Sequence, residues 1–141
     1  GLFNGAGRML WAAVSDKFGR MPTFVTILLM LGSSLLLIPH ADGPVVFYLL
    51  AAVIYLCYGG AFGTMPSTAG DFFGLKNAGS IYGPMLIAWS IGGVAGPLLS
   101  SAMIGTTPEG NYVLAFSTVG IIALAGAVLP LVTKRPRAMT R

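Results

Sequence analysis

The chain has 141 residues, and its composition excludes a water-soluble domain. Hydrophobic residues make up 55% of it, charged residues only 9%, and the mean hydropathy is +0.83. A soluble domain needs about a quarter of its residues charged to cover its surface. The net charge is +4, but the basic residues share no polar surface, which excludes a nucleic-acid binder. The 20 glycines and 9 prolines instead suit helices packed in lipid.

Five stretches have the apolar character of membrane-spanning helices. Four of them approach or meet the roughly 20 residues that cross a bilayer, whereas the first is too short. We expect that first stretch to be a span whose outer part is missing. The predicted spans are 1–14, 21–38, 45–66, 77–104 and 112–133, followed by a basic tail at 134–141. The sequence therefore predicts an all-α polytopic membrane protein with five transmembrane helices.

The connectors between these spans set the expected topology. They are short and rich in turn residues, at 15–20, 39–44, 67–76 and 105–111, so neighbouring helices should run antiparallel. Lys and Arg occur in the first and third connectors and in the tail, and the second and fourth connectors have none. Because such residues stay on the cytoplasmic side, we expect the N-terminus outside and the C-terminus in the cytoplasm. The short connectors and compact tail favour a bacterial inner membrane.

Small residues recur at four-residue spacing in the predicted helices. Such pairs allow the backbones of two helices to approach closely, although a chain rich in glycine also contains some by chance. The pairs are Gly59 with Gly63, Gly79 with Gly83, and Gly92 with Gly96. A second interpretation is a point of flexing, as in the broken helices of transporters. The residues concerned are Gly92, Gly93, Gly96 and Pro97.

Arg8 is the residue most informative about function. It lies eight positions before Asp16, which is about 12 Å along a helix and near mid-membrane. A charged side chain at that depth usually faces the interior of a bundle or a wet cavity. A guanidinium pairs with a carboxylate in bidentate fashion, which indicates an organic anion as ligand. The alternative is that Arg8 extends down to the cytoplasmic headgroups.

Aromatic residues at helical spacing are candidates to line the same cavity. Tyr55, Tyr58 and Phe62 share one helix face, and Tyr82 and Trp89 share another. Ordinary packing or an aromatic belt at the membrane interface explains this pattern equally well.

The sequence gives no support for catalysis, a metal site or a cofactor. His40 is the single histidine and suits a solvated turn, while Cys57 lies alone in an apolar run. No further His or Cys is spaced to complete a metal site. Nucleophilic catalysis lacks support because no histidine or lysine is placed to activate Ser67, Ser80 or Ser100. We expect no enzyme and no bound cofactor.

Two motifs give a resemblance to a known family. The segment 15–20, SDKFGR, resembles the loop signature G-x-x-x-D-x-x-G-R of the major facilitator superfamily, with Ala12 where a leading glycine is usual. The run DFFGLKNAGSIYG at 71–83, followed by Ala88, Trp89 and Gly96-Pro97, is similar to the entry to the eleventh helix in the oxalate:formate antiporter branch and its monocarboxylate-transporter relatives. The resemblance implies helices 8 to 12 of a twelve-helix transporter, with the N-terminal half missing.

The resemblance also implies roles for individual residues. Arg8 matches an arginine that binds substrate carboxylate in the monocarboxylate-transporter relatives. Asn4 stands where those relatives have an aspartate linked to proton coupling, so coupling at this position is in doubt. Trp89 stands where oxalate transporters have a lysine, which argues for a monocarboxylate rather than a dianion. Aromatics of the family's tenth helix line the cavity, which favours Tyr58 and Phe62, and Tyr82 with Trp89 would close its other side.

The predicted function is secondary active transport of a small organic anion, with a monocarboxylate favoured, by alternating access. The expected gating loop contains Asp16, Lys17, Gly19 and Arg20, and its partner helix belongs to the missing half. The expected partners are the anion, a coupling proton or counter-anion, the lipid bilayer and the N-terminal half. The alternative is a non-transporting membrane scaffold or assembly subunit, in which Arg8 serves helix assembly.

Overall fold

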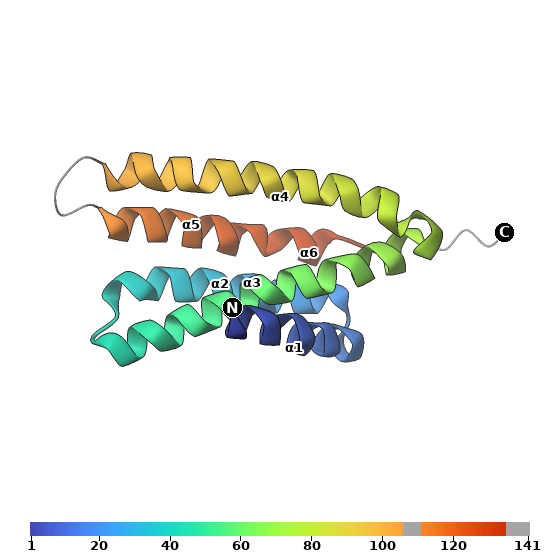
Figure 1. Ribbon diagram of the computed structural model, residues 1–141, viewed down its shortest axis with the longest axis horizontal. Helices are drawn as coiled ribbons and strands as arrows, with labels where there is room; N and C mark the ends of the chain where they lie inside the picture. The colour runs from blue at the N-terminus through green and yellow to red at the C-terminus, as the bar shows by residue number, and fades with distance from the viewer. Residues whose placement is uncertain (106–110, 135–141) are drawn as a thin grey trace.

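The protein is a bundle of α-helices that run along one long axis (Figure 1). The computed structural model describes residues 1–105 and 111–134. No strand occurs among these residues, so the expected all-α fold class is confirmed. The elements are α1 (Leu2–Phe18), α2 (Arg20–Leu37), the 3-10 turn η1 (Ile38–His40), α3 (Pro44–Phe73), α4 (Leu75–Ile104), α5 (Tyr112–Gly126) and α6 (Val128–Val132).

Single glycines separate helices that are close in sequence. Gly19, with φ at +97°, lies between α1 and α2, and Gly74, with φ at +83°, lies between α3 and α4. Both values fall in the left-handed region, which glycine reaches without steric cost. The chain therefore reverses direction at each point without a long loop.

The expected connector at 67–76 is wrong, because helix occupies most of it. α3 continues through Pro66 to Phe73, and only Gly74 interrupts the helical path. Pro66 has no N–H to donate to the carbonyl four residues earlier. Side-chain hydroxyl groups add hydrogen bonds to a different carbonyl in the turns around it. The hydroxyl groups of Ser67 and Thr68 both donate to the Thr64 carbonyl. The turn-forming residues of the connector therefore lie within the end of a helix.

Four segments are long and apolar enough to cross a membrane. They are Arg20–His40, Pro44–Phe73, Leu75–Ile104 and Tyr112–Val132, which agree in position with the last four predicted spans. α1 is not among them: it has 17 residues and carries Arg8, Asp16 and Lys17. A fifth span at the N-terminus stays a prediction.

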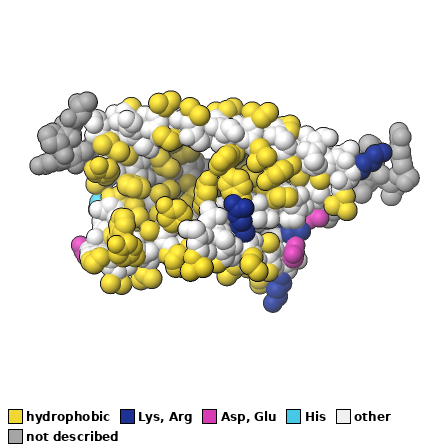
Figure 2. Space-filling model, viewed as in Figure 1, with side chains coloured by type: hydrophobic (Ala, Val, Ile, Leu, Met, Phe, Trp, Pro, Cys, Tyr) yellow, Lys and Arg dark blue, Asp and Glu magenta, His cyan; other side chains and the backbone are white. Residues whose placement is uncertain are grey.

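Charged side chains gather at the two ends of the bundle. Lys17, Arg20 and Lys76 lie where α1 and α3 end and where α2 and α4 begin, a region called the basic end below. His40 and Asp42 lie at the other end, between α2 and α3. Figure 2 shows apolar side chains over most of the face between these ends, with a basic group midway along it. This pattern agrees with the expected alternation of connectors.

Close packing is concentrated between α1 and α3. The core includes Trp11 of α1, Ile27 of α2 and Cys57 of α3. A Cβ at Gly59 would collide with the Asn4 carbonyl, and one at Gly63 would lie 2.5 Å from the Arg8 carbonyl oxygen. The packing role expected for this pair is therefore confirmed.

The glycines of α4 behave differently. α4 has no buried residue, although it lies beside α3 and α5 (Figure 1). A Cβ added at any of its helical glycines would meet no atom within 4 Å among the described residues. Within the described chain, the packing role expected for these positions is therefore not found. They are Gly79, Gly83, Gly92, Gly93 and Gly96.

Candidate functional site

Arg8 lies in the middle of α1, and a neutral side chain holds it. Its Nε donates a hydrogen bond to Oδ1 of Asn4, one turn earlier, at 3.3 Å. Arg8 is exposed, and among residues 1–105 and 111–134 it forms no ion pair. Because an amide carries no charge, Asn4 orients the guanidinium without neutralising it. Among the described residues, the guanidinium therefore has a neutral hydrogen-bond partner and no countercharge.

The Arg8 guanidinium lies over one aromatic ring, which contacts two further rings. Cζ of Arg8 lies 5.6 Å from the centroid of the Phe62 ring, within the range of a cation–π contact. The Phe62 centroid is 5.4 Å from that of Tyr58 and 5.1 Å from that of Trp89, with the rings edge to face. The group joins α1, α3 and α4 at one place. We call Asn4, Arg8, Tyr58, Phe62 and Trp89 the arginine–aromatic cluster.

The cluster contains five of the six substrate-binding residues predicted from the sequence. Tyr82, the sixth, is half-buried on α4, two turns before Trp89, and makes no ring contact among the described residues. Tyr55 is exposed and also lies outside the cluster. The structure thus connects α1 to α3 through Arg8 and Phe62, and α3 to α4 through Phe62 and Trp89.

The close approach of α1 and α3 makes the cluster possible. Gly59 lies against the backbone of Asn4, and Gly63 lies against the backbone of Arg8. Gly63 contacts the backbone of Arg8, and its neighbour Phe62 places its ring against the Arg8 side chain. Larger residues at the two glycine positions would separate the helices and move the ring away from the guanidinium.

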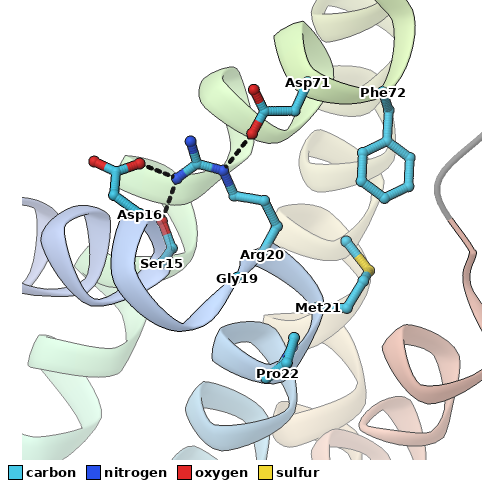
Figure 3. Close-up of a pocket in the computed structure, with 8 residues that line it drawn as sticks. All are labelled: Ser15, Asp16, Gly19, Arg20, Met21, Pro22, Asp71 and Phe72. Atoms are coloured by element: carbon cyan, nitrogen blue, oxygen red, sulfur yellow. Dashed lines mark hydrogen bonds and ion pairs between the residues drawn. The ribbon is translucent and has the colours of Figure 1, made fainter. Parts of the chain in front are cut away.

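A second charged group lies at the basic end (Figure 3). The guanidinium of Arg20 lies between two carboxylates, 2.5 Å from Asp16 and 2.7 Å from Asp71. It also donates to the hydroxyl of Ser15. These contacts join the end of α1, the start of α2 and the last turn of α3.

The Arg20 group borders an open pocket of about 380 Å³. Figure 3 shows the carboxylates of Asp16 and Asp71 on either side of the Arg20 guanidinium, with Phe72 and Met21 to its right and Pro22 below. The lining of the pocket is therefore partly charged and partly apolar.

The expected gating loop is only partly assembled around Arg20. Gly19 supplies the turn, and Asp16 pairs with Arg20. Lys17 points elsewhere, with Nζ 5.5 Å from the centroid of the Phe18 ring. Ser15 and Asp71 were not predicted as partners of Arg20. Asp71 opens the DFFGLKN run, but nothing in its local sequence indicates a partner 51 positions away.

Comparison with known protein families identifies the family to which the chain belongs. A family model described as Major Facilitator Superfamily matches residues 1–141. The chain belongs to the major facilitator superfamily. Together with the four long apolar helices, this membership indicates an integral membrane protein.

Three relatives within the superfamily are similar to the chain. The oxalate:formate antiporter of Oxalobacter formigenes is 31% identical over 99% of this chain and 34% of its own length. The apicoplast pyruvate carrier 2 of Toxoplasma gondii is 29% identical over 58% of the chain and 13% of its own length. An uncharacterized MFS-type transporter of Escherichia coli K12, YhjX, is 29% identical over 64% and 23%. The chain thus spans about a third or less of each relative, and no solved structure matches it.

Cys57 and His40, the residues considered for a metal site or catalysis, belong neither to the arginine–aromatic cluster nor to the contacts of Arg20. Cys57 is buried in the core with Trp11 and Ile27. His40 is in η1 at the end opposite Arg20. No group of three His, Cys, Asp or Glu side chains suited to a metal occurs among the described residues.

Proposed function

We propose that the chain forms helices 8 to 12 of a carrier that moves a small monocarboxylate across the membrane by alternating access. The observation that carries the proposal is Arg8, a guanidinium with a neutral partner, halfway along an apolar helix bundle and over the Phe62 ring, which contacts Tyr58 and Trp89. Superfamily membership and the relatives' transport names support the same class, a carrier and not an enzyme.

The charge of Arg8 supports an anionic substrate. A guanidinium at mid-membrane is costly unless it faces water or an anion. Asn4 occupies Nε only, so the terminal N–H groups of Arg8 are available to a carboxylate in the bidentate geometry that favours arginine. An anion that enters would pair with the charge that the described chain leaves unpaired.

The aromatic side of the cluster supports a monocarboxylate over a dianion. Trp89, which contacts Phe62, stands where the family resemblance places a lysine in oxalate transporters. An indole offers no second cation, so this half provides one positive charge for the substrate. One relative is named a pyruvate carrier, and pyruvate is a monocarboxylate.

The Arg20 group supports the gating part of the proposal. Contacts of Arg20 with Asp16 and Asp71 fasten three helix ends at the basic end, which we assign to the cytoplasmic side. Opening that side would require some of these contacts to rearrange. The membrane is assigned as a bacterial inner membrane, and the N-terminal half supplies the facing wall and any coupling site.

Uptake by the full-length protein in proteoliposomes tests the proposal. The substrates are labelled pyruvate, lactate, formate and oxalate, and wild type is compared with Arg8→Ala, Arg8→Lys and the control Lys17→Ala. We expect uptake of at least one monocarboxylate, loss of at least about tenfold with both Arg8 variants, and little change with Lys17→Ala. A lysine should fail because it lacks the planar fork of donors. Uptake unaffected by Arg8→Lys would favour an assembly role for Arg8, and no uptake of any of the four would refute the proposed substrate class.

A further inference from the structure

We propose that Phe62 is a positioning residue that fixes the Arg8 guanidinium for its substrate. The inference rests on the proposed anion-carrier function and deepens it. Phe62 was predicted from the sequence to touch the substrate. The geometry assigns it instead to the arginine, since its ring faces the guanidinium.

The Arg8 side chain is fixed at two places. Its Nε is held by Asn4 at 3.3 Å, and its Cζ lies 5.6 Å from the Phe62 centroid. Arginine has several freely rotating side-chain bonds, so one hydrogen bond at Nε leaves the plane of the guanidinium free to turn. A ring beside the guanidinium restricts that rotation through cation–π attraction. The terminal nitrogens are then presented in a defined direction.

The Phe62 ring is itself well supported. Its contacts with Tyr58 and Trp89 have interplanar angles of 64° and 83°, both in the edge-to-face range. Next to it, Gly63 lies directly against the backbone of Arg8. The ring therefore has neighbours on its own helix and on α4, and its position relative to α1 is set by backbone contact. A support of this kind gives a binding group a fixed geometry.

Positioning is expected to affect affinity more than turnover. Cation–π contacts correspond to about a 2- to 30-fold change in an equilibrium constant, from exposed to desolvated settings. Loss of the ring should therefore raise KM for the transported monocarboxylate by a factor in that range. If the ring only filled space, an aliphatic side chain of similar volume could replace it without raising KM.

The test compares Phe62→Leu, Phe62→Met and Phe62→Tyr in the full-length protein. Leucine and methionine fill most of the space without a π face, while tyrosine keeps the ring. The control is Phe47→Leu, on the same helix near its other end, where the ring contact recorded is with Tyr48. KM and maximal rate are measured in proteoliposomes for the monocarboxylate that wild type carries. Rates of phenylglyoxal modification of Arg8 are measured without substrate, by mass spectrometry of the peptide.

We expect Phe62→Leu and Phe62→Met to raise KM by about 2- to 30-fold, to change the maximal rate less, and to speed the modification of Arg8. Phe62→Tyr should restore values close to wild type, and Phe47→Leu should match wild type throughout. Wild-type KM and modification rates in both aliphatic variants would overturn the inference. If wild type carries none of the tested anions, the proposed function fails. The modification rates then decide whether Phe62 holds Arg8.

Discussion

Arg20 and Asp71 lie 51 positions apart in the sequence, and Nε of Arg20 lies 2.7 Å from Oδ2 of Asp71. The contact connects the first residue of α2 to the last turn of α3. Asp16 approaches the same guanidinium from α1. One arginine thus joins three helix ends, and its position at the basic end suits a contact that changes as the carrier opens.

The first prediction concerns this contact. Asp71→Asn in the full-length protein removes the charge but keeps the shape, so we expect unfolding free energy to fall by about 1 kcal/mol, because Asp71 is partly exposed. The maximal transport rate should change more than KM. Thermal unfolding in detergent and uptake kinetics give the two values.

A double-mutant cycle isolates the pair from the other contacts of both residues. Arg20→Gln, Asp71→Asn and the double variant are compared, with Asp42→Asn at the other end of the bundle as control. If the two single changes have additive effects on the unfolding free energy, Arg20 and Asp71 are not energetically coupled.

The second prediction concerns the α1–α3 contact. Gly63→Ala places a methyl group 2.5 Å from the Arg8 carbonyl oxygen, and helix backbone cannot shift as a side-chain end can. We expect a loss of about 1–3 kcal/mol of stability, as for other overpacked interiors, and a weaker substrate affinity. Gly5→Ala, on α1 with open space around it, is the matched control. Equal melting temperatures for the two variants would contradict the packing model.

The third prediction concerns the neutral partner of Arg8. Asn4→Asp places a carboxylate beside the guanidinium, and at neutral pH the two charges should pair and compete with the substrate. We expect KM for a monocarboxylate to rise severalfold and then to fall as pH is lowered and the new carboxyl group is protonated. Wild type should lack this recovery. Uptake measured across a pH series checks it, and a pH-independent KM in the variant would count against the proposed competition.

The fourth prediction concerns the charge of the substrate. Trp89→Lys adds a second cation on α4, adjacent to the Phe62 ring that faces Arg8. We expect oxalate uptake to increase relative to pyruvate, because a dianion then meets two positive charges. Trp89→Leu, which removes the indole without adding charge, separates the effect of charge from that of lost packing. A similar oxalate-to-pyruvate ratio in both variants would refute the charge argument.

Local sequence pattern was sufficient to predict most of the long helices. The apolar stretches predicted where the four long apolar helical segments lie, because the length of an apolar run is a property of the sequence alone. The connector at 67–76 was predicted wrongly, since its small and polar residues are typical of turns when considered by themselves. In the structure, helix continues there, and neighbouring hydroxyl groups bond to its carbonyls.

The candidate site shows where the sequence was sufficient and where it was not. The spacing of Arg8 from the charged connector, the neutral Asn4 one turn away and the glycine pair on α3 are each local patterns within a single helix. The contacts of Phe62 with Arg8 and of Asp71 with Arg20 came only from the tertiary structure. Helical periodicity fixes which residues share a face. It does not fix which faces of distant helices meet, because that depends on packing among all the helices at once.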